Sequence, residues 1–122
     1  MSQAGSQAWA FYRDVAKQRK VWTIRDDAGF PTSTTRDGKT AMPFWSSLSR
    51  VKKIISTVPA YAGFKPYELS WDDFCKAWVP GLTKDGLLVG VNWSGKKAIG
   101  YDMEPKRLQD NVEAVIAEET AK

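Results

Sequence analysis

The spacing of apolar residues predicts three helices with one buried face each. Residues 7–18 carry Ala, Phe, Tyr and Val at i, i+3, i+4 and i+7 positions, which is the helical period. A second apolar stripe follows Ser46 or Ser47, either of which can cap a helix, and Val58-Pro59 ends it. The last helix is expected to begin near Glu104-Pro105, because proline is well placed in a first helical turn.

A fourth helix is expected after Ser70, which precedes Trp71-Asp72-Asp73 as the cap of a capping-box variant. Its apolar side continues to Trp78, and Pro80-Gly81 should break or restart it. We expect Leu82 to fold back toward the core.

Short β-branched and aromatic runs predict the strands. The segments 21–24, 30–35 and 40–45 are separated by turn residues, among them Asp37-Gly38, and predict an antiparallel meander. Residues 67–69 form a short extended piece. The continuous apolar run at 87–91 is typical of a central strand buried on both faces, and 98–101 returns beside it.

Together these elements predict an α+β fold: a mixed, largely antiparallel sheet of about five strands with about four helices packed on it. A chain of 122 residues fits a single domain spanning 1–122. The ends, 1–6 and 118–122, are expected to fray.

The amino-acid composition excludes several kinds of catalytic and metal-binding site. The chain has no His and one Cys, which excludes His-dependent nucleophile activation, His metal sites, Cys-based zinc sites and an internal disulfide. We therefore expect no cofactor and no metal. No phosphate-binding glycine motif occurs, and Gly90 within a strand indicates a close backbone contact.

Carboxylates and the single thiol are the remaining candidates for catalysis. Asp26-Asp27 and Asp72-Asp73 suit a turn and a helix N-terminus, where Asp is favoured for structural reasons. Cys75 lies near a helix N-terminus, which could stabilise a thiolate, but its spacing from apolar neighbours favours a buried residue. We predict no catalytic residue, and an enzyme using carboxylates or Cys75 stays an alternative.

Charge is unevenly distributed: the net +4 divides into +7 over residues 1–65 (11 basic, 4 acidic) and −3 over residues 66–122 (7 basic, 10 acidic). A basic half can bind nucleic acid or an acidic partner, or serve only solubility. The nucleic-acid alternative would use the basic residues Arg19, Lys20, Arg50, Lys52, Lys53, Lys96 and Lys97, with Trp22, Trp45 and Trp93 as stacking surfaces.

Six Trp in 122 residues are more than a core of this size needs. An exposed aromatic surface would be typical of a protein interface. The predicted binding surface consists of five aromatic residues, Trp9, Trp45, Tyr61, Phe64 and Trp93. The alternative is that these side chains lie in the core or beneath Lys and Arg stems.

The chain contains no apolar stretch of about 18 residues that could span a membrane. The first seven residues lack the basic and apolar regions of a secretory signal. A cytoplasmic location is therefore expected.

Three stretches resemble the bacterial family described as domain of unknown function 2750. They run from Val21 to Trp45, from Leu69 to Trp93, and over Met103-Glu104-Pro105 with Leu108, so that the resemblance covers about residues 8–116. Ser46-Ser47 replaces the proline that family members often carry after Trp45. The resemblance implies a small bacterial α+β protein and brings no activity, cofactor or catalytic residue.

The leading hypothesis is a non-enzymatic cytoplasmic protein that acts by binding another protein, in an immunity or accessory role for a toxin or secretion system. That role is an analogy with other small bacterial α+β proteins. Nucleic-acid binding through the basic half is the first alternative, and neither the partner nor the oligomeric state follows from the residues.

Overall fold

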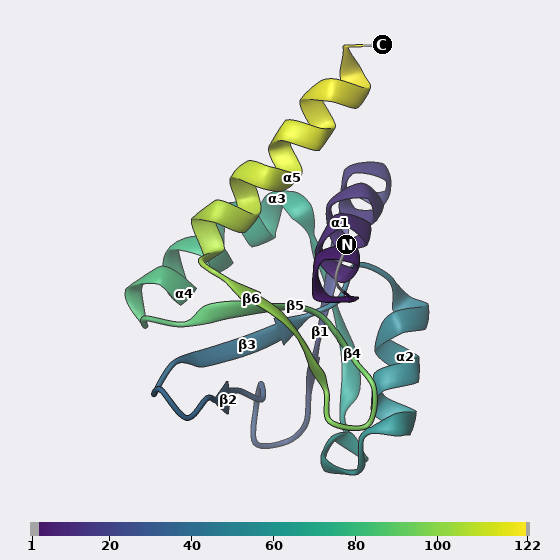
Figure 1. Cartoon of the computed structure of the whole chain (residues 1–122), viewed down its shortest axis with the longest axis vertical. Coiled ribbons are helices and arrows are strands. Elements are labelled where there is room, and N and C mark those ends of the chain that lie inside the picture. Colours follow the sequence, from purple (N-terminus) through teal and green to yellow (C-terminus); the bar gives the residue numbers. More distant parts are fainter. Residues whose placement is uncertain (1–2, 122) are drawn as a thin grey trace.

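The computed structural model describes residues 3–121, and its architecture is α+β (Figure 1). Its elements follow in the order α1 (Gln3–Gln18), β1 (Lys20–Arg25), β2 (Ser33–Thr34), β3 (Thr40–Phe44), α2 (Leu48–Thr57), the 3₁₀ turn η1 (Pro59–Tyr61), β4 (Lys65–Ser70), α3 (Trp71–Asp73), the π-helical turn η2 (Phe74–Trp78), α4 (Val79–Lys84), β5 (Leu88–Ser94), β6 (Ile99–Met103) and α5 (Pro105–Thr120).

The strands form two sheets joined at one point. A four-stranded sheet has the order β2-β3-β5-β6, in which β3 and β5 are parallel and the other pairs antiparallel. β1 pairs antiparallel with β4 in a separate two-stranded sheet. The two backbone hydrogen bonds between Trp22 and Trp45, 2.9 and 2.7 Å long, link β1 to the chain just after β3.

The predicted meander of segments 21–24, 30–35 and 40–45 is therefore wrong in part. The β2–β3 hairpin at Asp37-Gly38 is confirmed, but β1 does not pair with β2. Asp26 and Gly29 form a tight bridge of their own, which turns the chain away from β1 before β2 begins. The true partner of β1 is β4, whose paired residues lie 40 to 50 positions further along the chain, where local periodicity carries no information.

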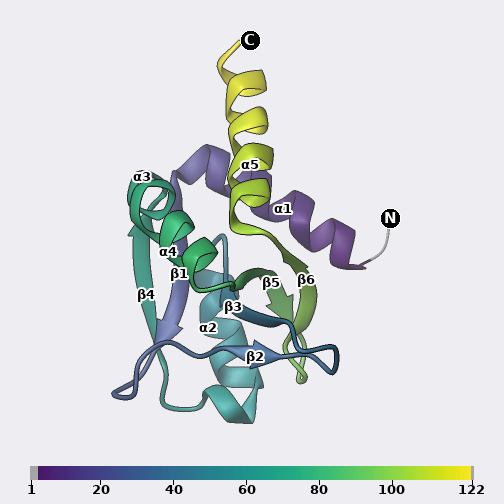
Figure 2. The same ribbon diagram turned by 90° about the vertical axis from the view of Figure 1, so that its left-hand side faces the viewer.

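The run at 87–91 forms the interior strand that its sequence predicts, because β5 lies between β3 and β6 and its residues 89–93 are all buried. α1 and α5 pack together against one face of the four-stranded sheet, with α4 beside α5, as Figures 1 and 2 show. α2 lies on the other side and contacts β1, β4 and β5. The C-terminal half of α5 extends beyond the sheets.

Helix starts agree with the sequence. The Ser47 hydroxyl accepts a hydrogen bond from the Arg50 N–H and caps α2, and the Ser70 hydroxyl accepts one from the Asp73 N–H at 3.0 Å. Pro105 lies in the first turn of α5. The ends predicted to fray are helical at 3–6 and 118–120, and residues 1, 2 and 122 lie outside the described part.

Of the two outcomes expected at Pro80-Gly81, a break or a restart, the structure shows a restart: α4 begins at Val79 with Pro80 in its first turn. α3, η2 and α4 follow one another without a gap through residues 71–84. In η2 the Val79 N–H donates to the Phe74 carbonyl, which widens the helix by one residue. Pro80 then falls in the first turn of α4, where a residue without an N–H is tolerated, and Leu82 is buried as predicted.

Two hydrophobic clusters hold these layers. The larger one joins α1, α5 and the 71–84 helix to the sheet through Phe11, Phe44, Phe74 and Leu108, all fully buried. The smaller one, here called the tryptophan cluster, joins α2 to both sheets. It consists of Trp22, Ile24, Ala41, Trp45, Val51, Ile54, Val58, Tyr61 and Trp93. The candidate site lies at its edge.

Candidate functional site

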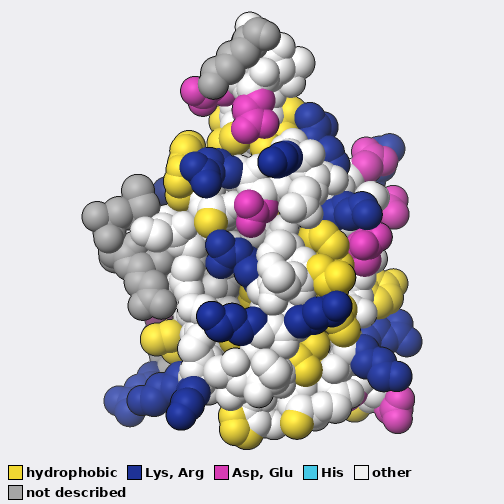
Figure 3. Space-filling model, turned by 90° about the vertical axis from the view of Figure 1, so that its right-hand side faces the viewer, with side chains coloured by type: hydrophobic (Ala, Val, Ile, Leu, Met, Phe, Trp, Pro, Cys, Tyr) yellow, Lys and Arg dark blue, Asp and Glu magenta, His cyan; other side chains and the backbone are white. Residues whose placement is uncertain are grey.

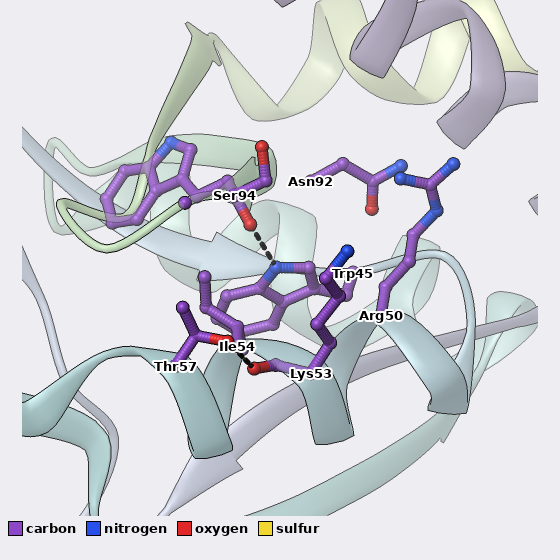
Figure 4. Close-up of a pocket in the computed structure, with 9 residues that line it drawn as sticks. Trp45, Arg50, Lys53, Ile54, Thr57, Asn92 and Ser94 are labelled. Atoms are coloured by element: carbon purple, nitrogen blue, oxygen red, sulfur yellow. Dashed lines mark hydrogen bonds between the residues drawn. The ribbon is translucent and has the colours of Figure 1, made fainter.

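A pocket of about 300 Å³ opens between α2 and the C-terminal end of β5 (Figure 4). Its lining residues come from three places in the sequence: Trp45 after β3, four residues of α2 (Arg50, Lys53, Ile54, Thr57) and the segment Asn92, Trp93, Ser94 and Gly95. Arg50 and Lys53 extend from α2 toward the strand end, and the Trp45 indole lies between them and β5.

A β-bulge shapes the inner end of this pocket. The pairing of β5 with β6 shifts between Val91 and Ser94, and Asn92 within that shift has a φ of +49°. Residues other than glycine rarely adopt this left-handed conformation, and asparagine is one of the few that tolerate it. Bulges and strained residues of this kind concentrate at functional sites.

Hydrogen bonds hold Asn92 in place. Its Oδ1 accepts from the Ser46 N–H at 2.9 Å, and its Nδ2 donates to the Ser46 hydroxyl at 2.9 Å and to the Gln7 carbonyl at 3.2 Å. The Ser46 hydroxyl in turn donates to Asp14 Oδ2 at 2.8 Å. Because Ser46 and Asn92 are both buried, this network fixes α1, the start of α2 and the bulge relative to one another.

The indole N–H groups of the two tryptophans in the pocket both donate hydrogen bonds to other groups of the protein. Trp45 Nε1 donates to the Trp93 carbonyl, and Trp93 Nε1 donates to Asp102 Oδ1, both at 2.8 Å. The Trp93 ring lies against Gly90 and Gly100, where a Cβ atom would come within 2.3 and 2.8 Å of ring atoms. The close contact predicted for Gly90 is thereby confirmed. Burial raises the pKa of the Asp102 carboxyl, although the bond from Trp93 opposes this shift.

The predicted aromatic binding surface does not exist as a surface. Trp45 and Trp93 are only 1% and 6% exposed, Tyr61 is buried, and Phe64 is half-buried against the tryptophan cluster. Only Trp9, on α1, is exposed, at 45%. The excess of tryptophan is explained by packing, because five of the six pack in the two hydrophobic clusters.

The structure places two of the seven predicted basic residues in the pocket lining and two more in the turn that follows the lining residue Gly95. Arg50 and Lys53 line the pocket, and Lys96 and Lys97 directly follow Gly95 in the exposed β5–β6 turn. These four residues are here called the basic rim. Figure 3 shows Lys and Arg side chains spread over this face, with Asp and Glu mainly toward its right-hand and upper margins.

The remaining three basic residues point elsewhere. Lys52 lies about 100° around α2 from Lys53, on the flank away from the pocket. Lys20 pairs with Glu68 at 3.6 Å on the β1–β4 sheet. Arg19 Nε donates to the Ala16 carbonyl at the end of α1. The seven predicted basic residues therefore do not all line the pocket.

Ion pairing within the basic rim is sparse. Arg50 Nε lies 3.7 Å from Asp14 Oδ2, a carboxylate that also accepts from Ser46. Within the described part of the chain, Lys53, Lys96 and Lys97 form no ion pair. The pocket thus combines apolar walls, a hydrogen-bonded floor and cations at its mouth.

Two of the carboxylates considered as catalytic candidates, Asp26 and Asp72, form contacts within their own elements. Asp26 Oδ1 accepts from the Ala28 N–H in its turn, and Asp72 pairs with Lys76 at 2.9 Å along the helix. Burial, with the nearby charges of Glu113 and Asp72, raises the pKa of the half-buried Cys75 thiol to about 11. The helix N-terminus does not produce a stabilised thiolate there.

The residues that sequence reasoning missed are those of the polar floor. Nothing in local periodicity marks Asn92, Ser46 or Asp14, and only the tolerance of asparagine for left-handed backbone could have drawn attention to Asn92. Among residues 3–121, no group of three His, Cys, Asp or Glu side chains is arranged to hold a metal ion. None of the described helices is long and apolar enough to cross a membrane.

Fold and site define a small α+β domain with a basic-rimmed pocket beside a strained bulge. The chain belongs to the family described as "Protein of unknown function (DUF2750)", whose model matches residues 8–112 and so confirms the resemblance seen in the sequence. No curated protein was found to match the sequence.

Proposed function

We propose that the chain is a non-enzymatic, cytoplasmic bacterial protein that binds an acidic surface of another protein, in an immunity or accessory role. The observation that carries this proposal is the basic rim. Three of its four cations, Lys53, Lys96 and Lys97, have no acidic partner among the described residues. Lys53 lines the pocket, and Lys96 and Lys97 follow its lining residue Gly95 in the chain. Charge complementarity of this kind speeds association and selects the partner.

A protein partner fits this face better than single-stranded nucleic acid does. Stacking recognition needs exposed aromatic rings, whereas Trp22, Trp45 and Trp93 are buried. Two of the predicted basic residues also have partners within the chain: Lys20 pairs with Glu68, and Arg19 Nε donates to the Ala16 carbonyl. The half-buried Cys75, with its raised pKa, gives no support to an enzyme that uses the thiol as nucleophile.

The test is affinity capture with matched charge variants. The double variant Lys96→Gln/Lys97→Gln removes two exposed turn cations, and Lys39→Gln/Lys84→Gln removes two exposed cations far from α2. The original chain and the control should capture the same acidic protein from cells of the source bacterium after nuclease treatment. The rim variant should capture about tenfold less, since surface charge pairs contribute about 0.2–1 kcal/mol each.

Two results would contradict the proposal. A partner captured equally by both double variants would place its binding site off the basic rim. Material that disappears on nuclease treatment would instead favour the nucleic-acid alternative, and its binding should then weaken steeply with salt.

A further inference from the structure

The strand β6 is an open edge of the four-stranded sheet. It pairs with β5 on one side, and no other element among residues 3–121 forms a backbone hydrogen bond to it. Figure 2 shows β6 at the outer margin of that sheet. Because the backbone N–H and C=O groups of a strand point alternately to its two sides, the outer side of β6 presents donors and acceptors to another strand.

The other strand edges carry features by which proteins prevent such pairing. β2, at the opposite end of the same sheet, has only two residues, and β4 contains Lys65, Pro66 and Glu68. β1 is bonded to the chain after β3 through Trp22 and Trp45. Short strands, charges and proline all discourage edge pairing, whereas β6 has five residues and contains neither lysine nor proline. β6 is therefore the edge best suited to pairing.

Large apolar side chains are exposed at this edge. Ile99 is 66% and Tyr101 is 37% exposed, and the alternation of side chains along a strand places both on the same face of β6. Trp9, which is 45% exposed, lies on α1, and α1 packs against β6. Within the described part of the chain, the one other exposed large hydrophobic side chain is Leu48 on α2. A second strand beside β6 would bury apolar area that the single chain leaves in contact with water.

The charges at the two ends of β6 make this edge complementary to a second copy of itself. Lys96 and Lys97 precede β6 in the β5–β6 turn, and Glu104 directly follows it. All three are exposed, and none of them forms an ion pair within the described residues. When two β6 strands run antiparallel, the basic end of each lies beside the acidic end of the other. A parallel arrangement would instead bring like charges together, which is unfavourable.

We propose that two copies of this chain associate through antiparallel pairing of their β6 strands. Pairing over the whole strand sets Tyr101 opposite Tyr101 of the second copy and Ile99 opposite Met103, and it joins the two sheets into one across a symmetric interface. The strand is short, so the interface is small and the association weak. Because Lys96 and Lys97 also belong to the basic rim, self-association and docking of an acidic protein compete for them.

The first measurement is sedimentation equilibrium of the purified chain at concentrations from about 5 µM to about 1 mM, which bracket weak association. We expect the average mass to rise from 13.7 kDa toward twice that value. Ile99→Lys places a charge on the seam and should weaken association at least about tenfold. Leu48→Lys makes the same change at the exposed apolar residue on α2 and should leave association unchanged. Far-ultraviolet circular dichroism checks that both variants fold.

Complementary charge variants test the orientation of the two strands. Glu104→Lys makes both ends of the edge basic, and Lys96→Glu/Lys97→Glu makes both ends acidic. Each variant alone should associate more weakly than the original chain. An equimolar mixture of the two should associate at least about fivefold more tightly than either alone, because opposite charges then meet at both ends of the seam.

A control mixture carries the same changes of charge away from β6. Glu118→Lys lies near the end of α5, and Lys52→Glu/Lys65→Glu lies on α2 and β4, all at exposed positions. This mixture should associate no more tightly than its components. Both experiments use the purified chain alone, so their results do not depend on the capture of an acidic protein.

Several outcomes would overturn the proposal. A mass that stays at 13.7 kDa at the highest concentration would mean that β6 does not pair with a second copy. A monomeric chain that captures another protein, and loses it in Ile99→Lys, would assign the edge to a strand of that protein instead. Equal losses in Ile99→Lys and Leu48→Lys would place the contact elsewhere, and an equal gain in both mixtures would mean a long-range charge effect.

Discussion

Replacing Gly90 by alanine tests how the wall of the pocket is built. Gly90 is buried in the central strand β5, and its backbone conformation is one that alanine can adopt. A Cβ atom there would lie 2.3 Å from Cε2 and Cζ2 of Trp93, far inside van der Waals contact. The indole must therefore move, and its 2.8 Å hydrogen bond to Asp102 is lost or bent.

The magnitude follows from three contributions. Overpacking in a core costs about 1–3 kcal/mol. The hydrogen bond adds about 1 kcal/mol. Alanine recovers about 0.5–1 kcal/mol of backbone entropy relative to glycine in a strand. The free energy of unfolding should therefore fall by about 2 kcal/mol, measured by urea denaturation followed by circular dichroism.

Gly81 is the matched control, because a Cβ atom at this helical glycine meets nothing within 4 Å. Gly81→Ala should stabilise the chain by about 0.5–1 kcal/mol. Trp93→Ala should also relieve the cost of Gly90→Ala, so that the two changes together cost less than their sum. A loss below about 0.5 kcal/mol for Gly90→Ala, or strict additivity with Trp93→Ala, would refute this packing.

Three further predictions concern the floor of the pocket and the titratable groups. Asn92→Gly keeps the left-handed backbone but leaves the buried Ser46 N–H without its partner, so the unfolding free energy should fall by about 2–3 kcal/mol in urea titrations. Cys75, with a pKa of about 11 against 9.0 for a free thiol, should react with iodoacetamide at pH 8 about 100-fold more slowly in the folded than in the unfolded chain; equal rates would contradict its burial. Burial raises the pKa of Asp102, so this carboxyl binds more protons in the folded chain than in the unfolded chain. Its contribution to the free energy of unfolding therefore falls as the pH rises from the unfolded-state pKa of 3.8 through the higher folded-state pKa. Asp102→Asn keeps an acceptor for Trp93 and should remove that fall in pH-dependent thermal unfolding; an unchanged pH profile would show that Asp102 does not titrate in this way.

Local sequence patterns predicted those structural features that are determined within a single helix or strand. The caps at Ser47 and Ser70, the buried stripe of α1 and the interior strand β5 all follow from spacing within one element. The pairing of β1 with β4 does not, because it joins segments separated by β2, β3 and α2. The restart of the helix at Pro80 was expected, but the π turn at Phe74–Trp78 that precedes it has no sign in the local sequence pattern.

The candidate site was harder to predict than the fold. Composition drew attention to Trp45 and Trp93 but placed them on a surface, whereas the structure buries both at the wall of a pocket. The count of charged residues selected Arg50, Lys52 and Lys53 alike as candidates for binding. Only the geometry of α2 shows that Arg50 and Lys53 face the pocket and Lys52 does not. The polar floor joins residues far apart in the sequence, 85 positions in the bond from Asn92 to Gln7, and no local signal reveals it.

The most direct test of the proposed function is photocrosslinking in living cells from two positions. Lys97→p-benzoylphenylalanine places the reactive group on the basic rim, and Lys84→p-benzoylphenylalanine places it at the exposed end of α4. We predict a nuclease-resistant adduct with one acidic protein from position 97 and none from position 84. The same adduct from both positions, an adduct only with nucleic acid, or none from position 97 would contradict docking of an acidic protein on the basic rim.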